Sequence, residues 1–262
     1  MIGKLKKNKF LSLTTLAAAS MLSILATPHL QAEESLLPLG GDSSQGTLQG
    51  ILDRVSTPRS VVLTARLSAL NPRQTLSGRQ SGTAVIRISG DHITVRIHAV
   101  GMDPSIMHMA HIHKGNRCPS QVREDANHDG VLDVIEGLPA YGPVLVNFGA
   151  DISSLAASAM GGVPMANASG IVNYAGAGSY SSLVADLHNR VAKDPATGIA
   201  KLAAGEIFKP QMGVIVVHGI RASKMLPAAT KTLKGSSPQM SLPVLCGRLH
   251  RVRNHLQIFS IE

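Results

Sequence analysis

The pattern on either side of Gly90-Asp91 constrains the fold more than any other feature of the sequence. Residues 82–89 and 92–100 each alternate apolar and polar side chains with a period of two, which is typical of a strand with one buried face. A Gly-Asp pair between two such segments predicts a tight hairpin turn. In the second segment we predict that one face is buried, the face formed by Ile93, Val95, Ile97 and Ala99. The other face carries His92 and His98, which we expect to meet solvent.

Further strand patterns occur along the rest of the chain, at residues 61–67, 108–113, 143–148, 170–174, 214–218 and 242–249. Residues 181–192 instead have apolar side chains at helical spacing, with Ser181 or Ser182 as an N-cap. Many short strands and one short helix predict an all-β domain over residues 59–250, an antiparallel β-sandwich or flattened barrel with long loops. Aromatic residues make up only 3% of the chain, so aliphatic side chains and methionine must form the core.

The first 32 residues have the pattern of an export signal. Four lysines precede an uncharged, mostly apolar run over residues 10–26, and Leu30-Gln31-Ala32 is a suitable cleavage site. The run is short for a membrane span, and we predict no later transmembrane segment. We therefore expect a periplasmic or secreted protein. Residues 33–58, rich in Ser, Gly, Gln and Pro, are predicted to be a linker or loosely packed arm, and residues 251–262 a basic tail.

The charge of the chain favours no macromolecular partner. The formal net charge of +9 falls to +5 without the four lysines of the export signal. The remaining excess lies mainly in residues 221–234 and 248–253, which is typical of a solubilising surface. Few aromatic residues are present to stack on bases, and no nucleic-acid-binding motif occurs, so we do not expect nucleic acid as a partner. The oligomeric state stays open.

The sequence has two cysteines, Cys118 and Cys246. Export would place them in an oxidising compartment, so we predict that they form a disulfide. The chain-entropy model gives about 4 to 5 kcal/mol of stabilisation for so long a loop. The alternative is a pair of buried free thiols.

Three histidines fall within six residues, at His108, His111 and His113. Their β-branched and small neighbours favour a strand. Side chains alternate along a strand, so His111 and His113 point the same way, roughly 7 Å apart. Two imidazoles on one face can bind a soft or borderline metal ion. The alternative is a set of surface histidines without a ligand.

Three sequence pieces occur in order: the His108-x-x-His111-x-His113 strand followed by Cys118, the strand end Val217-His218, and Cys246-Gly247. Together they resemble the copper/zinc superoxide dismutases, and the layout is also similar to that of bacterial chordin-type (CHRD) domains. The resemblance implies a Greek-key β-sandwich. It also implies copper ligands at His111, His113 and His218, a supporting role in the second ligand shell for His108, and a disulfide between the two cysteines.

The sequence departs from the dismutase pattern at three places. Residues 119–124 contain no histidine where the metal-bridging histidine belongs, and the zinc ligands are not recognisable, so zinc is not expected. Pro243 stands where the dismutases have an arginine that guides superoxide. One hypothesis is therefore a copper-only dismutase-like enzyme in which residues 221–234 supply the positive field. The other is a CHRD-type protein that binds copper and calcium in the cell envelope without turnover.

A second metal motif occupies the place of the zinc loop. Residues 125–136 match a calcium loop at every ligand position: Asp125, Asn127, Asp129, Val131, Asp133 and Glu136. Gly130 permits the sharp turn that such a loop needs. Gly137-Leu138-Pro139 is predicted to stop any helix after the loop, and residues near Cys118 do not look helical either. We expect calcium to order this segment; the alternative is an acidic, solvated turn.

Overall fold

The computed structural model describes residues 60–190 and 198–252. The predicted export signal, the predicted linker and the tail from residue 253 lie outside these ranges. None of the helices in the described ranges has both the length and the apolar character that a membrane span requires.

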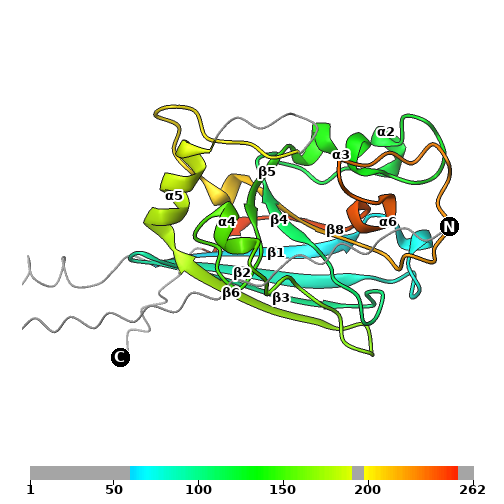
Figure 1. Cartoon of the computed structure of the whole chain (residues 1–262), viewed down its shortest axis with the longest axis horizontal. Coiled ribbons are helices and arrows are strands. Elements are labelled where there is room, and N and C mark those ends of the chain that lie inside the picture. The colour runs from blue at the N-terminus through cyan, green and yellow to red at the C-terminus, as the bar shows by residue number, and fades with distance from the viewer. Residues whose placement is uncertain (1–59, 191–197, 253–262) are drawn as a thin grey trace, which may run out of the picture. The chain divides into compact units, whose positions relative to one another are not determined.

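Nine strands form one curled, antiparallel sheet (Figure 1). Eight of them lie in the order β5-β4-β7-β8-β1-β2-β3-β6, and β9 pairs with β1. This confirms the predicted all-β class. The strands are β1 (Val61–Ala69), β2 (Ser81–Ser89), β3 (His92–Val100), β4 (Ala110–His113), β5 (Val144–Asn147), β6 (Val172–Ser179), β7 (Val214–His218), β8 (Pro243–Arg248) and β9 (His250–Arg251).

The β2–β3 hairpin agrees with its prediction residue by residue. The two strands pair from Ser89↔His92 to Ser81↔Val100, and Gly90 takes a positive φ of 56° in the turn. The four apolar residues of β3 predicted to be buried are at most 2% exposed, whereas His92 and His98 are exposed. The period-two pattern therefore identifies the buried face correctly.

β7 is buried along its whole length, and it separates two hydrophobic clusters. Its alternate residues Ile215 and Val217 belong to the main core. Val214 and Val216 point to the other face and pack in a small cluster with Tyr141 and Cys246. A strand buried on both faces explains the continuous apolar run in the sequence.

β6 is longer than the predicted strand at 170–174, because its glycines are part of the sheet. Gly176 and Gly178 pair with Val95 and Ile93 of β3. A Cβ atom at Gly178 would lie 2.6 Å from Ser153 Oγ, so the chain passing over this strand leaves no room for a side chain. The Gly-Ala alternation thus reflects close packing and not a loop.

Helices are more numerous than the one predicted. The predicted helix exists as α5 (Tyr180–Asn189), one residue before its expected start, and its N-cap is Ser179 instead of Ser181 or Ser182. Residues 191 and 192 of the predicted helix lie outside the described ranges. The described residues also form α2 (Gln121–Glu124), α3 (Val134–Tyr141), α4 (Leu155–Ser158) and α6 (Pro238–Ser241). Arg251, predicted to begin the basic tail, instead pairs with Leu63 as part of β9.

The prediction that Gly137-Leu138-Pro139 stops a helix is wrong, since α3 runs through Pro139. The Asp133 side chain caps this helix by accepting hydrogen bonds from the backbone N–H groups of Ile135 and Glu136. The Glu136 side chain in turn accepts a hydrogen bond from the backbone N–H of Asp133. This capping box stabilises the first turn. Pro139 lies in the second turn with its ring exposed, where it removes only the hydrogen bond to the carbonyl of Ile135.

Candidate metal centre

Adjacent strands β4 and β7 bring His111, His113 and His218 together. The two strands are antiparallel, with Ala110 opposite Val217 and His111 opposite Val216. His111 and His113 share one face of β4, and His218 lies at the end of β7. One ligand nitrogen from each ring lies within 4.8 Å of the other two, which is close enough for all three to bind one ion.

Each of the three rings has one buried nitrogen without a hydrogen-bond partner: Nδ1 of His111, Nε2 of His113 and Nε2 of His218. The opposite nitrogens of His113 and His218 are engaged. Nδ1 of His113 lies 2.7 Å from the carbonyl oxygen of Gly142, and Nδ1 of His218 lies 2.7 Å from that of Ser241. A carbonyl oxygen only accepts, so Nδ1–H donates in each case. In the neutral ring, Nε2 then carries the lone pair that a metal ion needs.

The surroundings keep the three rings neutral. Burial lowers the pKa of His113 to about 3 and that of His218 to about 4. Burial, together with repulsion from His218 and His113, holds the pKa of His111 well below its ordinary value. A metal ion therefore does not compete with protons for these nitrogens near neutral pH. Unpartnered buried lone pairs are costly, and a bound cation would satisfy all three. The donor set fits a metal ion.

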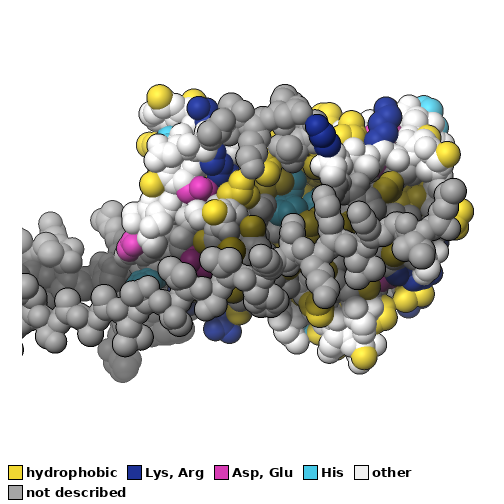
Figure 2. All heavy atoms as spheres, viewed as in Figure 1, with side chains coloured by type: hydrophobic (Ala, Val, Ile, Leu, Met, Phe, Trp, Pro, Cys, Tyr) yellow, Lys and Arg dark blue, Asp and Glu magenta, His cyan; other side chains and the backbone are white. Residues whose placement is uncertain are grey.

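The three histidines line a small cavity of about 40 Å³. This volume exceeds the roughly 10–15 Å³ that a cavity needs to hold one water molecule. Two helices contribute to its walls, α3 through Val134, Leu138 and Tyr141, and α6 through Ser241. The remaining lining residues are Met109, Val144, Gly198, Leu233 and Ser236. Near the centre of the face drawn in Figure 2, histidine side chains are visible between hydrophobic ones, set back from the surface.

Tyr141 packs directly against the histidine cluster. Its ring centroid lies 4.6 Å from that of His113, and its hydroxyl donates to the carbonyl oxygen of Val134 at 2.7 Å. Burial raises the pKa of this phenol, so it remains a neutral hydrogen-bond donor. The residue after it, Gly142, supplies the carbonyl that orients His113. The end of α3 thus positions one of the three rings.

His108 lies outside the cluster but contacts its backbone. The ring is fully buried, with Nδ1 3.2 Å from the carbonyl oxygen of His218 and Nε2 3.0 Å from that of Asp103. The ring thus lies between the end of β7 and the segment that precedes β4. The supporting role that the resemblance implies for His108 stays a prediction.

The predicted disulfide between Cys118 and Cys246 is confirmed. Cys246 lies on β8 opposite Val216 of β7, two residues before His218. The bridge therefore fixes the segment after β4 to the strand beside the histidine-bearing strand. A constraint at this point limits how far the walls of the cavity can move.

The carboxylate groups of the predicted calcium loop, residues 125–136, do not converge on one point. In the described parts of the chain, the three histidines are the one group of His, Cys, Asp or Glu ligand atoms found within this spacing. The loop carboxylates instead accept hydrogen bonds from backbone N–H groups of the same segment. Glu136 accepts from Ala126, Asn127 and Asp133, and Asp125 accepts from Gly130.

Two features of this loop nevertheless agree with the calcium motif. Gly130 has a φ of 77°, the left-handed conformation predicted for the sharp turn. Oδ1 of Asp125, at the first ligand position, is buried without a hydrogen-bond partner. Of the other predicted ligand positions, Asn127 and Asp129 hydrogen bond to each other, while Val131 and Asp133 are buried.

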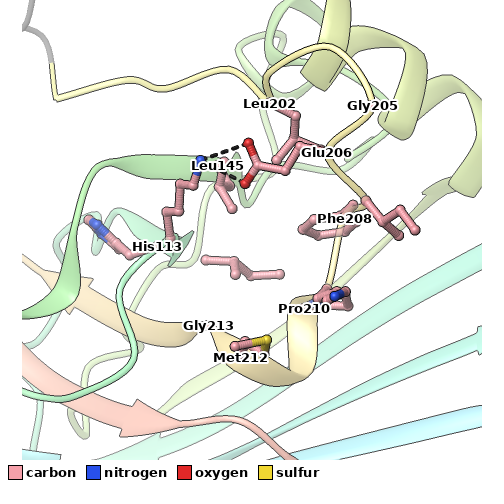
Figure 3. A pocket seen from close by; sticks show the side chains of 13 residues that line it. His113, Leu145, Leu202, Gly205, Glu206, Phe208, Pro210, Met212 and Gly213 are labelled. Carbon is pink, nitrogen blue, oxygen red and sulfur yellow. Dashed lines mark hydrogen bonds and ion pairs between the residues drawn. The ribbon is translucent and has the colours of Figure 1, made fainter.

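A wider pocket of about 460 Å³ lies on the opposite side of β4 (Figure 3). Figure 3 shows the His113 ring pointing away from Glu206, Phe208 and Met212, which line this pocket. Two of its three Lys and Glu lining residues pair with each other, because Lys114 Nζ lies 2.7 Å from Glu206 Oε1; the third is Lys209. The small cavity, which holds the three unpartnered nitrogens, is therefore the better candidate site despite its size.

Sequence reasoning missed three contributors to the site. Met109 could have been found, because alternation along the predicted strand at residues 108–113 would place it on the same face as His111. Tyr141 and the carbonyl group of Ser241 carry no local signal, since they reach the histidines only through the tertiary fold. Comparison of the chain with protein-family models and with curated proteins finds no match.

Proposed function

We propose that this chain is an exported protein that binds one copper ion through His111, His113 and His218. The observation that supports this function most strongly is the convergence of three histidines. One ligand nitrogen of each lies within 4.8 Å of the others, and each ring has one buried nitrogen without a hydrogen-bond partner. Imidazole suits copper, zinc, iron and nickel alike, so the donor set alone does not select the metal. The resemblance to the copper/zinc dismutases, in which the matching residues hold copper, favours copper. The disulfide and the lysine-rich, apolar start of the chain support export.

Equilibrium dialysis against Cu(II) and Zn(II), with metal content measured afterwards, tests this proposal. The wild-type protein is expected to retain one equivalent of copper, and His218→Ala is expected to lose most of it. His98→Ala is a matched control, because His98 is exposed on β3 and lies outside the site. Copper retention that is equal in wild type and His218→Ala would refute the proposal.

Non-catalytic binding is the function that the cavity favours. Among the described residues that line it, none carries a charge, and most are apolar. Such walls hold an ion but offer no charged group to attract an anionic substrate. On this proposal the protein stores or delivers copper in the cell envelope, in the manner of the CHRD-type alternative.

Superoxide dismutation is a second candidate function. Leu233, which belongs to the basic segment 221–234, lines the cavity. Its sequence neighbours Lys231 and Lys234 have exposed side chains. A positive field of this kind increases the encounter rate with a small anion. Stopped-flow superoxide decay with the copper-loaded protein decides between the two functions. A rate equal to that of His218→Ala would exclude dismutation, and a faster rate that falls with ionic strength would support it.

We further propose that residues 125–136 bind calcium, which would order the loop beside α3. The unpartnered Oδ1 of Asp125 and the turn at Gly130 support this proposal. Addition of Ca(II) is expected to raise the melting temperature and protease resistance of the wild-type protein, and EGTA is expected to reverse both effects. Asp125→Asn keeps the side-chain shape but removes the charge, so its response to Ca(II) should be much weaker. A melting temperature that is the same in Ca(II) and in EGTA would refute a calcium site.

A further inference from the structure

Among the described residues that line the cavity, Met109 is the one sulfur donor. Met109 precedes His111 by two residues, and both residues line the cavity together with His113. Met109 directly precedes β4, and its backbone is joined to the end of β7, because the N–H of His218 donates to the carbonyl oxygen of Met109 at 2.7 Å. Met109 is thus hydrogen-bonded to the ligand residue His218 and is itself one of the residues that line the cavity.

The hydroxyl groups that line the cavity are less available than the Met109 thioether. The hydroxyl of Tyr141 donates to Val134, and that of Ser241 lies 2.7 Å from the hydroxyl of Thr232. Ser236 remains as a hard oxygen donor. Thioether sulfur and hydroxyl oxygen select different metals, because sulfur prefers Cu(I) whereas oxygen prefers harder ions.

The charge balance of the cavity also favours a monovalent ion. Three neutral imidazoles neutralise no charge, and none of the described lining residues is a carboxylate. A divalent ion would therefore leave two uncompensated charges among apolar side chains, and Cu(I) would leave one. Since burial of uncompensated charge is costly, the walls favour the lower oxidation state.

We propose that Met109 is a fourth ligand, whose thioether sulfur joins the three histidine nitrogens and makes this site selective for Cu(I) over Zn(II). This inference rests on the proposed metal function of the histidines and deepens it. The nitrogens set the position of the ion, and the sulfur sets the preference for Cu(I). On this account Met109→Leu keeps the volume of the side chain but removes the soft donor.

Competition against a coloured Cu(I) chelator under anaerobic conditions, with a parallel Zn(II) titration, tests the proposal. Met109→Leu is expected to bind Cu(I) at least tenfold more weakly than wild type, with Zn(II) affinity within about threefold of wild type. X-ray absorption of the Cu(I)-loaded wild type is expected to contain a sulfur scatterer that is missing from Met109→Leu. Met225→Leu is a matched control, because Met225 is 87% exposed and does not line the cavity.

Equal Cu(I) affinity in wild type and Met109→Leu would overturn the role of Met109 while leaving the histidine site intact. Failure of the wild type to bind either Cu(I) or Zn(II) would overturn the proposed function itself, so the two failures are distinguishable. Melting curves of the metal-free proteins control for folding. Equal melting temperatures for wild type and Met109→Leu would exclude a merely structural cause of weaker binding.

Discussion

The buried histidines make the stability of the metal-free protein depend on pH. In the folded protein the pKa of His113 is about 3 and that of His218 about 4, whereas an unfolded histidine titrates near 6.5. As the pH falls below 6.5, these histidines bind protons in the unfolded state but not in the folded state. Stability is therefore fully present above about pH 6.5 and is lost as the pH falls toward the folded-state pKa values.

The size of the effect follows from these pKa values. Between pH 7 and pH 5, each of the two histidines is expected to lower the free energy of unfolding by about 2 kcal/mol, or about 4 kcal/mol together. This is a large fraction of the 5–15 kcal/mol that is typical of folded domains. His111 adds to the loss in the same direction, because its pKa is also lowered.

Urea denaturation of the EDTA-treated protein at pH 7 and pH 5 measures this loss. Carboxylates can titrate over part of the same range, so the informative quantity is the difference between wild type and a His113→Gln/His218→Gln variant. The variant is expected to lose about 4 kcal/mol less than wild type over this interval. His98→Gln is the control, since an exposed ring should leave the loss unchanged. Equal losses in wild type and the double variant would refute the idea that these rings are buried and neutral.

Three further substitutions test the supports of the site. Replacement of Cys118 and Cys246 by Ala should lower the free energy of unfolding by about 4 to 5 kcal/mol in non-reducing urea denaturation, and an unchanged midpoint would contradict the bridge. Gly115→Ala should lower the free energy of unfolding by about 1 to 3 kcal/mol, because the added Cβ would collide with the backbone of Tyr141. Chemical denaturation measures this loss, and an unchanged free energy would contradict the close approach. Asn71→Ala should lower the free energy of unfolding by about 3 kcal/mol or more, since its buried amide hydrogen bonds to the backbone of Leu132 and of Pro243. Thermal unfolding measures this, and a loss below about 1 kcal/mol would contradict those contacts.

The sequence predicts the β2–β3 hairpin closely because its determinants are local. Period-two alternation and a Gly-Asp turn need no information from the rest of the chain. The opposite holds for β6, where Gly176 and Gly178 lie in a strand only because another segment packs over them. Local glycine preference alone predicts a loop there, and a tertiary contact overrides it.

The same contrast between local and tertiary determinants explains which parts of the metal site the sequence predicts. Alternation places His111 and His113 on one face, but the approach of His218 depends on the pairing of β4 with β7, which was expected from a resemblance and not from local physics. The carbonyl groups that orient the rings, of Gly142 and Ser241, come from helix ends far away in sequence. No local pattern reveals such contacts.

The α3 helix was missed although its signal was present. Asp133 and Glu136 stand three residues apart before apolar residues, which is the spacing of a capping box. The same two residues also fit a calcium loop, and Pro139 suggested a helix stop. A proline that follows a well-capped first turn is thus weaker evidence against a helix than its general preference implies.

Anomalous diffraction from copper-loaded crystals, recorded at the copper absorption edge, tests the central claim most directly. The account predicts one dominant peak, within bonding distance of Nδ1 of His111 and of Nε2 of both His113 and His218. A dominant copper peak elsewhere in the molecule, with these three nitrogens unligated, would contradict it.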